Sequence, residues 1–348
     1  MMNKLFTFLL AVFLPFLSSG QSTHEVKLEK QNAGLTGSLR GVDVVDGETV
    51  WIAGAGGVYS FSCDGGKSWK TGNVPGAEKL DFRDVHAFSA QHVLLMSCGN
   101  GSDSRIYQTR DGGKNWKLCY QNSYEKAFFN GIAFWDQQHG ILTSDPIDEK
   151  PYLLVTQDAG EHWSPLQPSE IPVLKEGEFA FAASGTGIVT KGEQEVWLLT
   201  GGLVSRVFYS ANRGKTWKAY STPIVQGTPS EGIYSFCADG EEQAIAVGGS
   251  WKRTEETKGN VILSGDGGKT WRRAKGVAGV AFKECVKYLG DNCYIITGPT
   301  GTALSKDLGE HWETIDSTPF HAVDYHKESG IGWMVGAGGQ VYRLEWQR

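Results

Sequence analysis

Six acidic or amide side chains recur in one short pattern: Ser or Thr, any residue, Asp or Asn, any residue, Gly, two residues and Trp. A carboxylate next to a hydroxyl group has the chemistry to ligate a cation or to act as an acid or base. Successive copies lie 47, 47, 54, 54 and 41 residues apart, so we expect one copy per structural unit and no convergence on a single substrate. The acidic or amide positions are Asp64, Asp111, Asp158, Asn212, Asp266 and Asp307.

The same pattern is typical of a tight turn between two strands. An Asp or Asn side chain accepts backbone N–H groups across such a turn, and Gly adopts the positive φ that the turn needs. The Trp then begins the returning strand. We therefore interpret the pattern as a turn, and we predict no metal site and no cofactor. The tryptophans are Trp69, Trp116, Trp163, Trp217, Trp271 and Trp312.

Each turn closes a longer unit of four short strands. Residues 40–45, 50–53 and 58–61 have strand patterns with turn signals between them, and a fourth strand begins at Trp69. Four strands in roughly 47 residues is the size of one propeller blade. Glycine contributes 46 of the 348 residues, beside 12 Trp, which fits many tight turns and many buried aromatic rings.

The two ends of the chain are predicted to share one blade. Residues 319–348 contain three strands without the turn motif, and the alternating residues 22–31 have no partner of their own. Pairing them would remove an exposed sheet edge. The sequence therefore predicts an all-β fold, a seven-bladed β-propeller of four-stranded blades over residues 21–348, closed by an N-terminal strand that completes blade seven.

Residues 1–20 are typical of a signal peptide. Lys4 precedes an apolar run at residues 5–17, and small residues follow at 18–20. The alternative is a membrane anchor, but the run is shorter than the ~20 residues that a spanning helix needs. We predict cleavage, no stable membrane anchor afterwards, and an exported protein, periplasmic or extracellular.

Charge and cysteine content narrow the possible partners. The chain has 33 basic and 39 acidic residues, a formal charge of −6, which argues against non-specific nucleic-acid binding. The irregular spacing of the cysteines indicates neither a zinc site nor a disulfide framework, so buried thiols are favoured and the pairing stays open. The cysteines are Cys63, Cys98, Cys119, Cys237, Cys285 and Cys293.

The six turns resemble the BNR or Asp-box repeats of sialidases, sortilin-type receptors and some glucanases. The whole unit, with its Leu-Arg-Gly-Val segment at 39–42, Trp51, Gly54 and the turn at 64–69, looks most like the photosystem II stability/assembly factor type of propeller, which has exported bacterial relatives. The resemblance covers the predicted mature chain and implies the fold. It says little about function, because propellers host unrelated activities.

A ring of polar residues is predicted on the face opposite the turns, at one mouth of the central channel. Aligning the units on their Gly-rich loops places one residue per blade at the start of the innermost strand. The ring is either a wet channel mouth or a ligand site in which two arginines bind an anionic group. Its members are Arg40, Arg83, Asn130, Thr186, Glu231, Glu284 and His321.

Two loops on that face add candidates for partner binding. Asp145 lies in an acidic segment at 144–150, and Trp251 lies among charged residues in the long loop at 249–259. An exposed Trp beside charges is a common interface anchor. The alternative is that the Trp251 ring packs down onto its own blade.

These features favour an exported binding or assembly scaffold that recognises a protein, a peptide or a glycan at this face. The alternative is a carbohydrate-active hydrolase, sialidase-like or another glycosidase, with Glu231 and Glu284 as facing carboxylates in adjacent blades. A sialidase is disfavoured because the segment Arg-Ile-Pro is missing near the start and seven units are present, whereas sialidase propellers have six. An enzyme is therefore the less favoured class.

Overall fold

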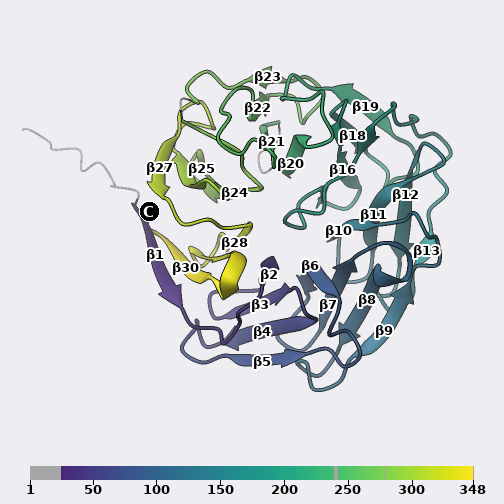
Figure 1. Ribbon diagram of the computed structural model, residues 1–348, viewed down its shortest axis with the longest axis vertical. Coiled ribbons are helices and arrows are strands. Elements are labelled where there is room, and N and C mark those ends of the chain that lie inside the picture. Colours follow the sequence, from purple (N-terminus) through teal and green to yellow (C-terminus); the bar gives the residue numbers. More distant parts are fainter. Residues whose placement is uncertain (1–24, 239–241, 278, 348) are drawn as a thin grey trace, which may run out of the picture.

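The computed structural model describes residues 25–238, 242–277 and 279–347. The predicted signal peptide, residues 1–20, lies outside the described residues. Seven antiparallel sheets stand around a central axis, and in each the first strand of the unit lies innermost (Figure 1). The seven-bladed, all-β architecture predicted from the sequence is confirmed.

Blades 1 to 3 follow the order of the chain from inside to outside. Blade 1 contains β2 (Leu39–Val44), β3 (Thr49–Gly54), β4 (Val58–Cys63) and β5 (Lys70–Asn73). Blade 2 contains β6 (Asp81–Ala87), β7 (Val93–Cys98), β8 (Arg105–Thr109) and β9 (Lys117–Gln121), with the 3-10 turn η1 (Gly101–Asp103) between β7 and β8. Blade 3 contains β10 (Phe129–Phe134), β11 (Gly140–Ile147), β12 (Lys150–Thr156) and β13 (Ser164–Pro165).

Blades 4 to 6 keep the same order. Blade 4 contains β15 (Ile188–Lys191), β16 (Glu195–Leu199), β18 (Arg206–Ser210) and β19 (Lys218–Ser221). Blade 5 contains β20 (Glu231–Cys237), β21 (Ala244–Ser250), β22 (Val261–Ser264) and β23 (Arg272–Arg273). Blade 6 contains β24 (Cys285–Gly290), β25 (Cys293–Gly298), β26 (Gly301–Ser305) and β27 (Glu313–Asp316).

Blade 7 is built from both ends of the described chain. It contains β28 (Ala322–His326), β29 (Ile331–Val335) and β30 (Val341–Gln347), with the 3-10 turn η2 (Ala337–Gly339) before β30. The outer strand is β1 (Glu25–Gln31), which pairs with β30 in unbroken antiparallel register from Glu25 opposite Gln347 to Gln31 opposite Val341. The predicted ring closure by an N-terminal strand is therefore confirmed.

Blade 5 departs from the four-stranded template. Two short strands, β14 (Glu178–Phe179) and β17 (Gly201–Gly202), extend its sheet at the inner edge of β20. The backbones approach closely there, and a β-carbon on Gly232 would lie 2.3 Å from the Cα of Gly201. Glycine is required at this crossing because any side chain would clash.

The six recurring motifs form turns between the third and fourth strands of blades 1 to 6. In the first turn, Asp64 Oδ1 accepts the Ser68 N–H at 2.9 Å and the Ser62 hydroxyl at 2.8 Å. Hydrogen bonds from Ser68 and Ser62 lower the pKa of the exposed Asp64 carboxyl to about 2. The Asp or Asn side chain accepts from the backbone in the same way at Asp111, Asp158, Asn212, Asp266 and Asp307.

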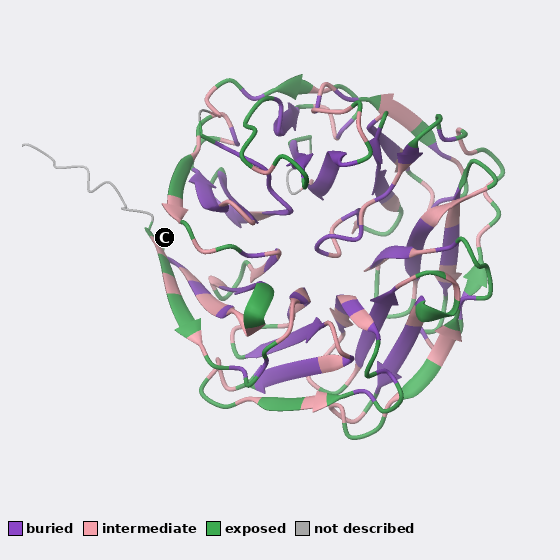
Figure 2. Cartoon of the chain, viewed as in Figure 1, coloured by how far each residue is buried: buried purple, intermediate pink, exposed green. Residues whose placement is uncertain are grey.

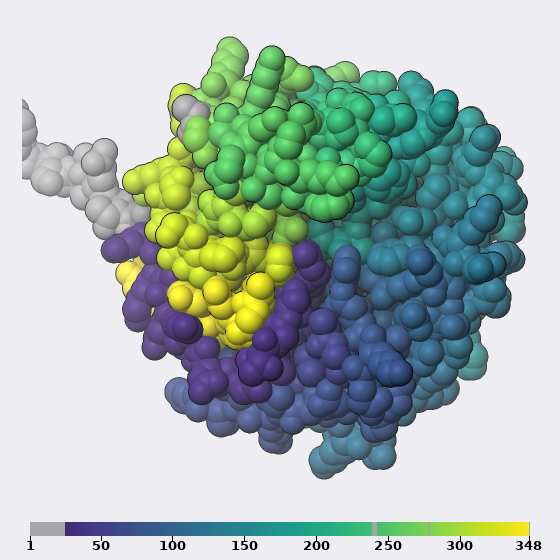
Figure 3. All heavy atoms as spheres, in the orientation of Figure 1, coloured from purple at the N-terminus to yellow at the C-terminus, as the bar shows by residue number. Residues whose placement is uncertain are grey.

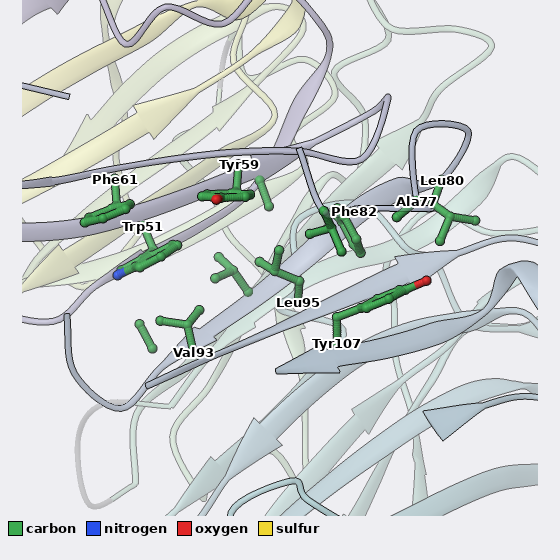
Figure 4. Close-up of a cluster of buried hydrophobic side chains, with 13 residues drawn as sticks. Trp51, Tyr59, Phe61, Ala77, Leu80, Phe82, Val93, Leu95 and Tyr107 are labelled. Atoms are coloured by element: carbon green, nitrogen blue, oxygen red, sulfur yellow. The ribbon is translucent and has the colours of Figure 1, made fainter. Parts of the chain in front are cut away.

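The hydrophobic core is divided among the spaces between neighbouring blades. Figure 2 shows buried residues along the inner and middle strands and exposed residues on the outer ones. Between blades 1 and 2, Trp51 is fully buried and stacks on Phe61, with ring centroids 4.1 Å apart. Figure 4 shows this cluster, in which Val93 and Leu95 face Trp51 from the next blade. Burial of apolar rings between blades holds the ring together.

Carboxylates in the channel join the innermost strands of successive blades. Asp324 Oδ2 accepts the Val44 N–H at 2.7 Å, and Asp43 Oδ2 accepts the Ala87 N–H at 2.6 Å. The Asp84 side chain continues the series by accepting the N–H of Ile132 in blade 3 at 2.8 Å. The inner edge of a blade would otherwise present backbone donors that lack a strand partner.

Candidate functional site

The candidate site lies where the innermost strands begin, at the mouth opposite the recurring turns. Register shifts place Arg40, Arg83 and Asn130 as bulged residues in β2, β6 and β10. A β-bulge redirects its side chain away from the regular pleat. Glu284 and His321 immediately precede β24 and β28, and Thr186 lies two residues before β15.

The structure corrects one member of the predicted ring. In blade 5 the register shift falls between Ile233 and Ser235, so Tyr234 is the bulged residue and Glu231 is not. The sequence Glu231-Gly232 resembles Arg40-Gly41 of blade 1, in which a polar residue precedes a glycine. Gly232, however, is a glycine because it lies against the extra strand β17. Its position therefore does not mark the bulge, and the alignment on this glycine placed Glu231 in the ring by mistake.

Residues 180–186 cross the channel mouth and fill it; we call them the plug segment. Arg40 Nη1 donates to the Ala183 carbonyl at 2.9 Å, and Arg83 Nη1 donates to the Ala182 carbonyl at 3.1 Å. The Ser184 hydroxyl donates to the Glu284 carbonyl at 2.9 Å. Figure 1 shows a loop beside β10 and β16 that reaches into the middle of the ring. The plug segment is therefore bonded to blades 1, 2 and 6 at the mouth.

A buried ion pair anchors the plug segment. The Glu178 side chain is fully buried, and its Oε2 lies 2.6 Å from Nη2 of Arg206. Glu178 also accepts the Thr200 hydroxyl at 2.6 Å and the Lys175 N–H at 2.8 Å. A buried carboxylate with this many partners holds one geometry firmly. The plug segment begins two residues after this anchor.

Glu284 joins two members of the predicted ring at the edge of the plug segment. Its carboxylate lies 3.4 Å from Nη1 of Arg40 and 2.5 Å from Nδ1 of His321. Arg83 has a carboxylate partner of its own, Asp81, at 2.7 Å. Both arginines are thus held by charge-assisted hydrogen bonds, which fix their guanidinium planes.

A pocket of about 260 Å³ opens between these groups and the plug segment. Its aromatic wall contains Phe181 and Tyr234, whose rings stack with centroids 4.0 Å apart. The lining residues are Arg40, Arg83, Phe181, Ala182, Ala183, Tyr234, Trp251 and Glu284. Figure 3 shows a hollow near the middle of the ring, between the blue N-terminal blades and the green segment.

Trp251 stands at this pocket and is 54% exposed. Its ring does not pack down onto its own blade, which was one of the two alternatives for this residue. The ammonium group of Lys252 lies 5.2 Å from the centroid of the Trp251 ring. An exposed indole beside a pocket is available for contact with a partner.

Asn130 and Thr186 are not among the residues that line this pocket. Asn130 donates to Asp145 Oδ1 at 3.0 Å, and burial raises the pKa of the Asp145 carboxyl to about 6. Thr186 donates to the Ser235 hydroxyl at 2.6 Å. The structure gathers three of the seven predicted ring residues, Arg40, Arg83 and Glu284, around one cavity, and His321 adjoins it through Glu284.

The two glutamates of the hydrolase alternative both act as hydrogen-bond and ion-pair acceptors. Glu231 pairs with Arg253 and accepts the Thr228 N–H at 3.1 Å. Glu284 is held by Arg40 and His321. A glycosidase needs two carboxyl groups that face each other across its substrate, whereas each of these glutamates is engaged by basic neighbours of its own. The contacts of these two residues therefore do not support the hydrolase alternative.

Other predictions from the sequence concern metals, thiols and membranes. Within the described residues, no group of three or more His, Cys, Asp or Glu side chains is arranged to hold a metal ion. Cys98, Cys285 and Cys293 are buried thiols, whereas Cys63 is exposed. The described part of the chain contains no helix with the length and apolar character to cross a bilayer.

The fold and the site define the protein as a seven-bladed β-propeller with a pocket beside the plug segment at one mouth of its channel. It is similar in structure to YCF48 from Cyanidioschyzon merolae, at 13% identity and a TM-score of 0.66, over 91% of this chain and 98% of that one. It is also similar to YCF48 bound to D1 peptide, at 14% identity and a TM-score of 0.64, over 91% of this chain and 96% of that one.

A third similar structure is the WD40 propeller domain of Doa1, at 15% identity and a TM-score of 0.60, over 92% of this chain and 97% of that one. Likeness at this level of identity establishes the fold alone. No family model matches the sequence, and no curated protein matches it either.

Proposed function

We propose that the protein is a binding or assembly scaffold, without enzymatic activity, that captures a protein or peptide partner at the pocket beside the plug segment. The observation that carries the proposal is the meeting of two fixed guanidinium groups, Arg40 and Arg83, with the exposed Trp251 at one cavity. Arginine and tryptophan are the residues that most often dominate binding energy at protein interfaces.

The chemistry of the pocket indicates what a partner presents. The described contacts of Arg40 involve its Nη1 atom alone, and a guanidinium group has five N–H donors. A partner carboxylate can therefore bind without breaking the contacts to the plug segment. The rings of Trp251 and Phe181 offer apolar surface beside it. The proposed ligand is a peptide segment with an acidic group next to an apolar side chain.

The similarity to YCF48 supports a protein partner in general, because one of the similar structures is YCF48 bound to D1 peptide. We also propose that the six turns are Asp-box repeats, because in each of them an Asp or Asn side chain accepts a backbone N–H group.

We further propose that residues 1–20 are cleaved and that the propeller acts outside the cytoplasm. Sequencing the N-terminus of the protein recovered from its source tests this last point.

The test of the binding site compares single variants as bait. Trp251→Ala and Arg83→Ala are expected to lose capture of the partner from the exported protein fraction of the source organism. Arg105→Ala is the control, because Arg105 is an arginine bonded to the Ser102 carbonyl, away from the pocket. Capture by both site variants at the level of the unchanged protein would contradict the assignment.

A glycan partner is separated from a protein partner in the same experiment. Treating the extract with a protease before capture removes a protein partner and leaves a glycan. Thermal unfolding of each variant shows whether the fold is retained. Loss of capture together with an unchanged unfolding temperature supports the proposed site, whereas loss of both reports only damage to the fold.

A further inference from the structure

Trp251 belongs to an exposed loop, residues 251–260, that connects β21 to β22; we call it the Trp251 loop. Residues 251–258 are exposed except for the half-buried Thr254, whereas Gly259 and Asn260 at the end of the loop are buried. A loop with so little buried surface depends on specific polar contacts for its conformation. Those contacts decide whether Trp251 stays at the pocket.

Two consecutive turns shape this loop. The Arg253 N–H donates to the Ser250 carbonyl at 3.1 Å, and the Glu256 N–H donates to the Arg253 carbonyl at 3.1 Å. Trp251 is a central residue of the first turn. Arg253 ends the first turn and begins the second, so the place where Arg253 is held sets the direction of both.

The second turn is attached to the segments that follow it. The Phe282 N–H donates to the Thr254 carbonyl at 2.9 Å. The buried Asn260 side chain donates to the Glu256 carbonyl at 2.6 Å. The first turn, which contains Trp251, is attached through the Trp251 N–H and through the side chain of Arg253, as follows.

The Arg253 side chain reaches a buried carboxylate at the start of the inner strand β20. Its Nη2 atom contacts Oε1 of Glu231, whose side chain is 5% exposed. Oε2 of Glu231 accepts the Thr228 N–H at 3.1 Å, so both carboxylate oxygens have a donor. A buried carboxylate is costly unless a cation balances it. The pair therefore holds the loop more firmly than an ion pair between two exposed side chains would.

The same end of β20 also forms a wall of the pocket. The Ser230 carbonyl accepts the Tyr234 hydroxyl at 2.8 Å and the Trp251 N–H at 3.3 Å. Tyr234 and Trp251 both line the pocket, and Glu231 follows Ser230 directly. Release of Arg253 from Glu231 would thus loosen Trp251 relative to the Tyr234 ring.

We propose that Glu231 and Arg253 are positioning residues, which hold Trp251 at the partner pocket. The inference rests on the proposed function, because a fixed Trp251 affects binding only if a partner meets it there. Neither Glu231 nor Arg253 lines the pocket, so their effect on a partner passes through Trp251. A ring that is held before binding reduces the ordering cost of binding.

Limited proteolysis of the full-length protein with chymotrypsin tests the placement without any partner. Chymotrypsin cleaves after large apolar residues, so the rate at which a fragment ending at Trp251 appears in mass spectra reports opening of the loop. Arg253→Ala is expected to speed this cleavage about tenfold, because a charged hydrogen bond to a buried group is lost. Unchanged cleavage would overturn the inference.

Three further variants separate positioning from general damage. Arg253→Lys keeps a cation for Glu231 and should restore much of the resistance to cleavage. Lys258→Ala is the matched control, since it removes an exposed cation from the same loop. Glu231→Gln/Arg253→Ala removes the buried charge together with its partner, so it should keep the unfolding temperature and still be cleaved rapidly. Slow cleavage of this double variant would contradict the inference.

Capture from the exported protein fraction distinguishes this inference from the proposed function. Glu231→Gln/Arg253→Ala should weaken capture by about three- to tenfold, the cost of ordering one side chain, and Lys258→Ala should not. Loss of capture by Trp251→Ala together with full capture by the double variant would overturn the inference and leave the proposed function standing. Full capture by both would contradict the proposed function, while rapid cleavage after Trp251 would still support the placement of the loop.

Discussion

The Asp84 carboxylate lies against the backbone of Gly185, so that a β-carbon on Gly185 would stand 2.3 Å from Asp84 Oδ1. Gly185 belongs to the plug segment, and Asp84 accepts the backbone N–H groups of Val85 at 2.9 Å and Ile132 at 2.8 Å. The plug segment therefore packs directly against the carboxylate that joins blades 2 and 3. The plug segment and the junction of blades 2 and 3 thus meet at this carboxylate.

Gly185→Ala is expected to lower the free energy of unfolding by about 1–3 kcal/mol, because the new methyl group meets Asp84 and φ is +74°. Gly192→Ala is the matched control: its φ is +55° and nothing lies within 4 Å of the added carbon. Denaturant titration measures both. An equal loss in the two variants would show that backbone strain alone, and not the contact with Asp84, accounts for the effect.

Glu178→Gln is expected to destabilise the protein by about 3–5 kcal/mol, since it leaves the buried Arg206 guanidinium without its counter-charge. Glu161→Gln breaks an exposed ion pair with Lys117 and should cost much less, because water screens the attraction between exposed charges. Urea unfolding followed by tryptophan fluorescence provides the comparison. If the two substitutions cost the same, the Glu178–Arg206 pair is not the anchor of the plug segment.

Asp84 should make stability depend on pH. Burial raises the pKa of Asp84 in the folded protein to about 7, from an ordinary value of 3.8. Burial, and then the charge of Asp324, also raises the pKa of Asp43. A folded state that keeps its proton to higher pH than the unfolded chain loses stability as pH rises between these values. The contribution of Asp84 is thus full below pH 4 and is lost between pH 4 and 7.

The measurement is the difference between the unchanged protein and Asp84→Asn over that window. The difference is needed because burial lowers the pKa of His86 to about 4, and this group adds stability as pH rises. The advantage of Asp84 over the variant should shrink from pH 4 to pH 7. An advantage that grows over the same window would show that Asp84 is ionised in the folded protein.

Removal of residues 1–31 is expected to lower the unfolding temperature and to cause association. The deletion takes away β1 and exposes the edge of β30, which pairs with it along seven residues. Exposed edges of this kind pair with other chains. Light scattering after gel filtration detects the oligomers. A monomer with an unchanged unfolding temperature would mean that β1 is dispensable for ring closure.

Much of the fold was predictable because its signal is local and repeated. Each turn motif, such as Ser62 to Trp69, carries its own acceptor, glycine and aromatic residue, so the six motifs mark six of the seven blades. The plug segment has no such signal beyond the longer gap of 54 residues between the third and fourth motifs. Its position depends on contacts between distant residues, such as Arg40 with Ala183, which a single sequence does not reveal.

Part of the site was also predictable from the repeated pattern of the units. Arg40 and Arg83 were found because the Gly-rich loops fix their place in the unit. Tyr234 was missed because Gly232 satisfies a separate backbone crossing and shifts the alignment by three residues. The channel carboxylates Asp43 and Asp324 were also missed, since an Asp in a strand gives no sign of which backbone donor it will meet.

The pairing of β1 with β30 also sets the order in which the molecule can be finished. β1 is made long before its partner β30, and contacts between residues so distant in the chain form slowly. The inner blades can assemble from local hairpins while both ends are still loose. Closure is then a single late event, and a chain that stalls before β30 remains an open arc with two unpaired edges.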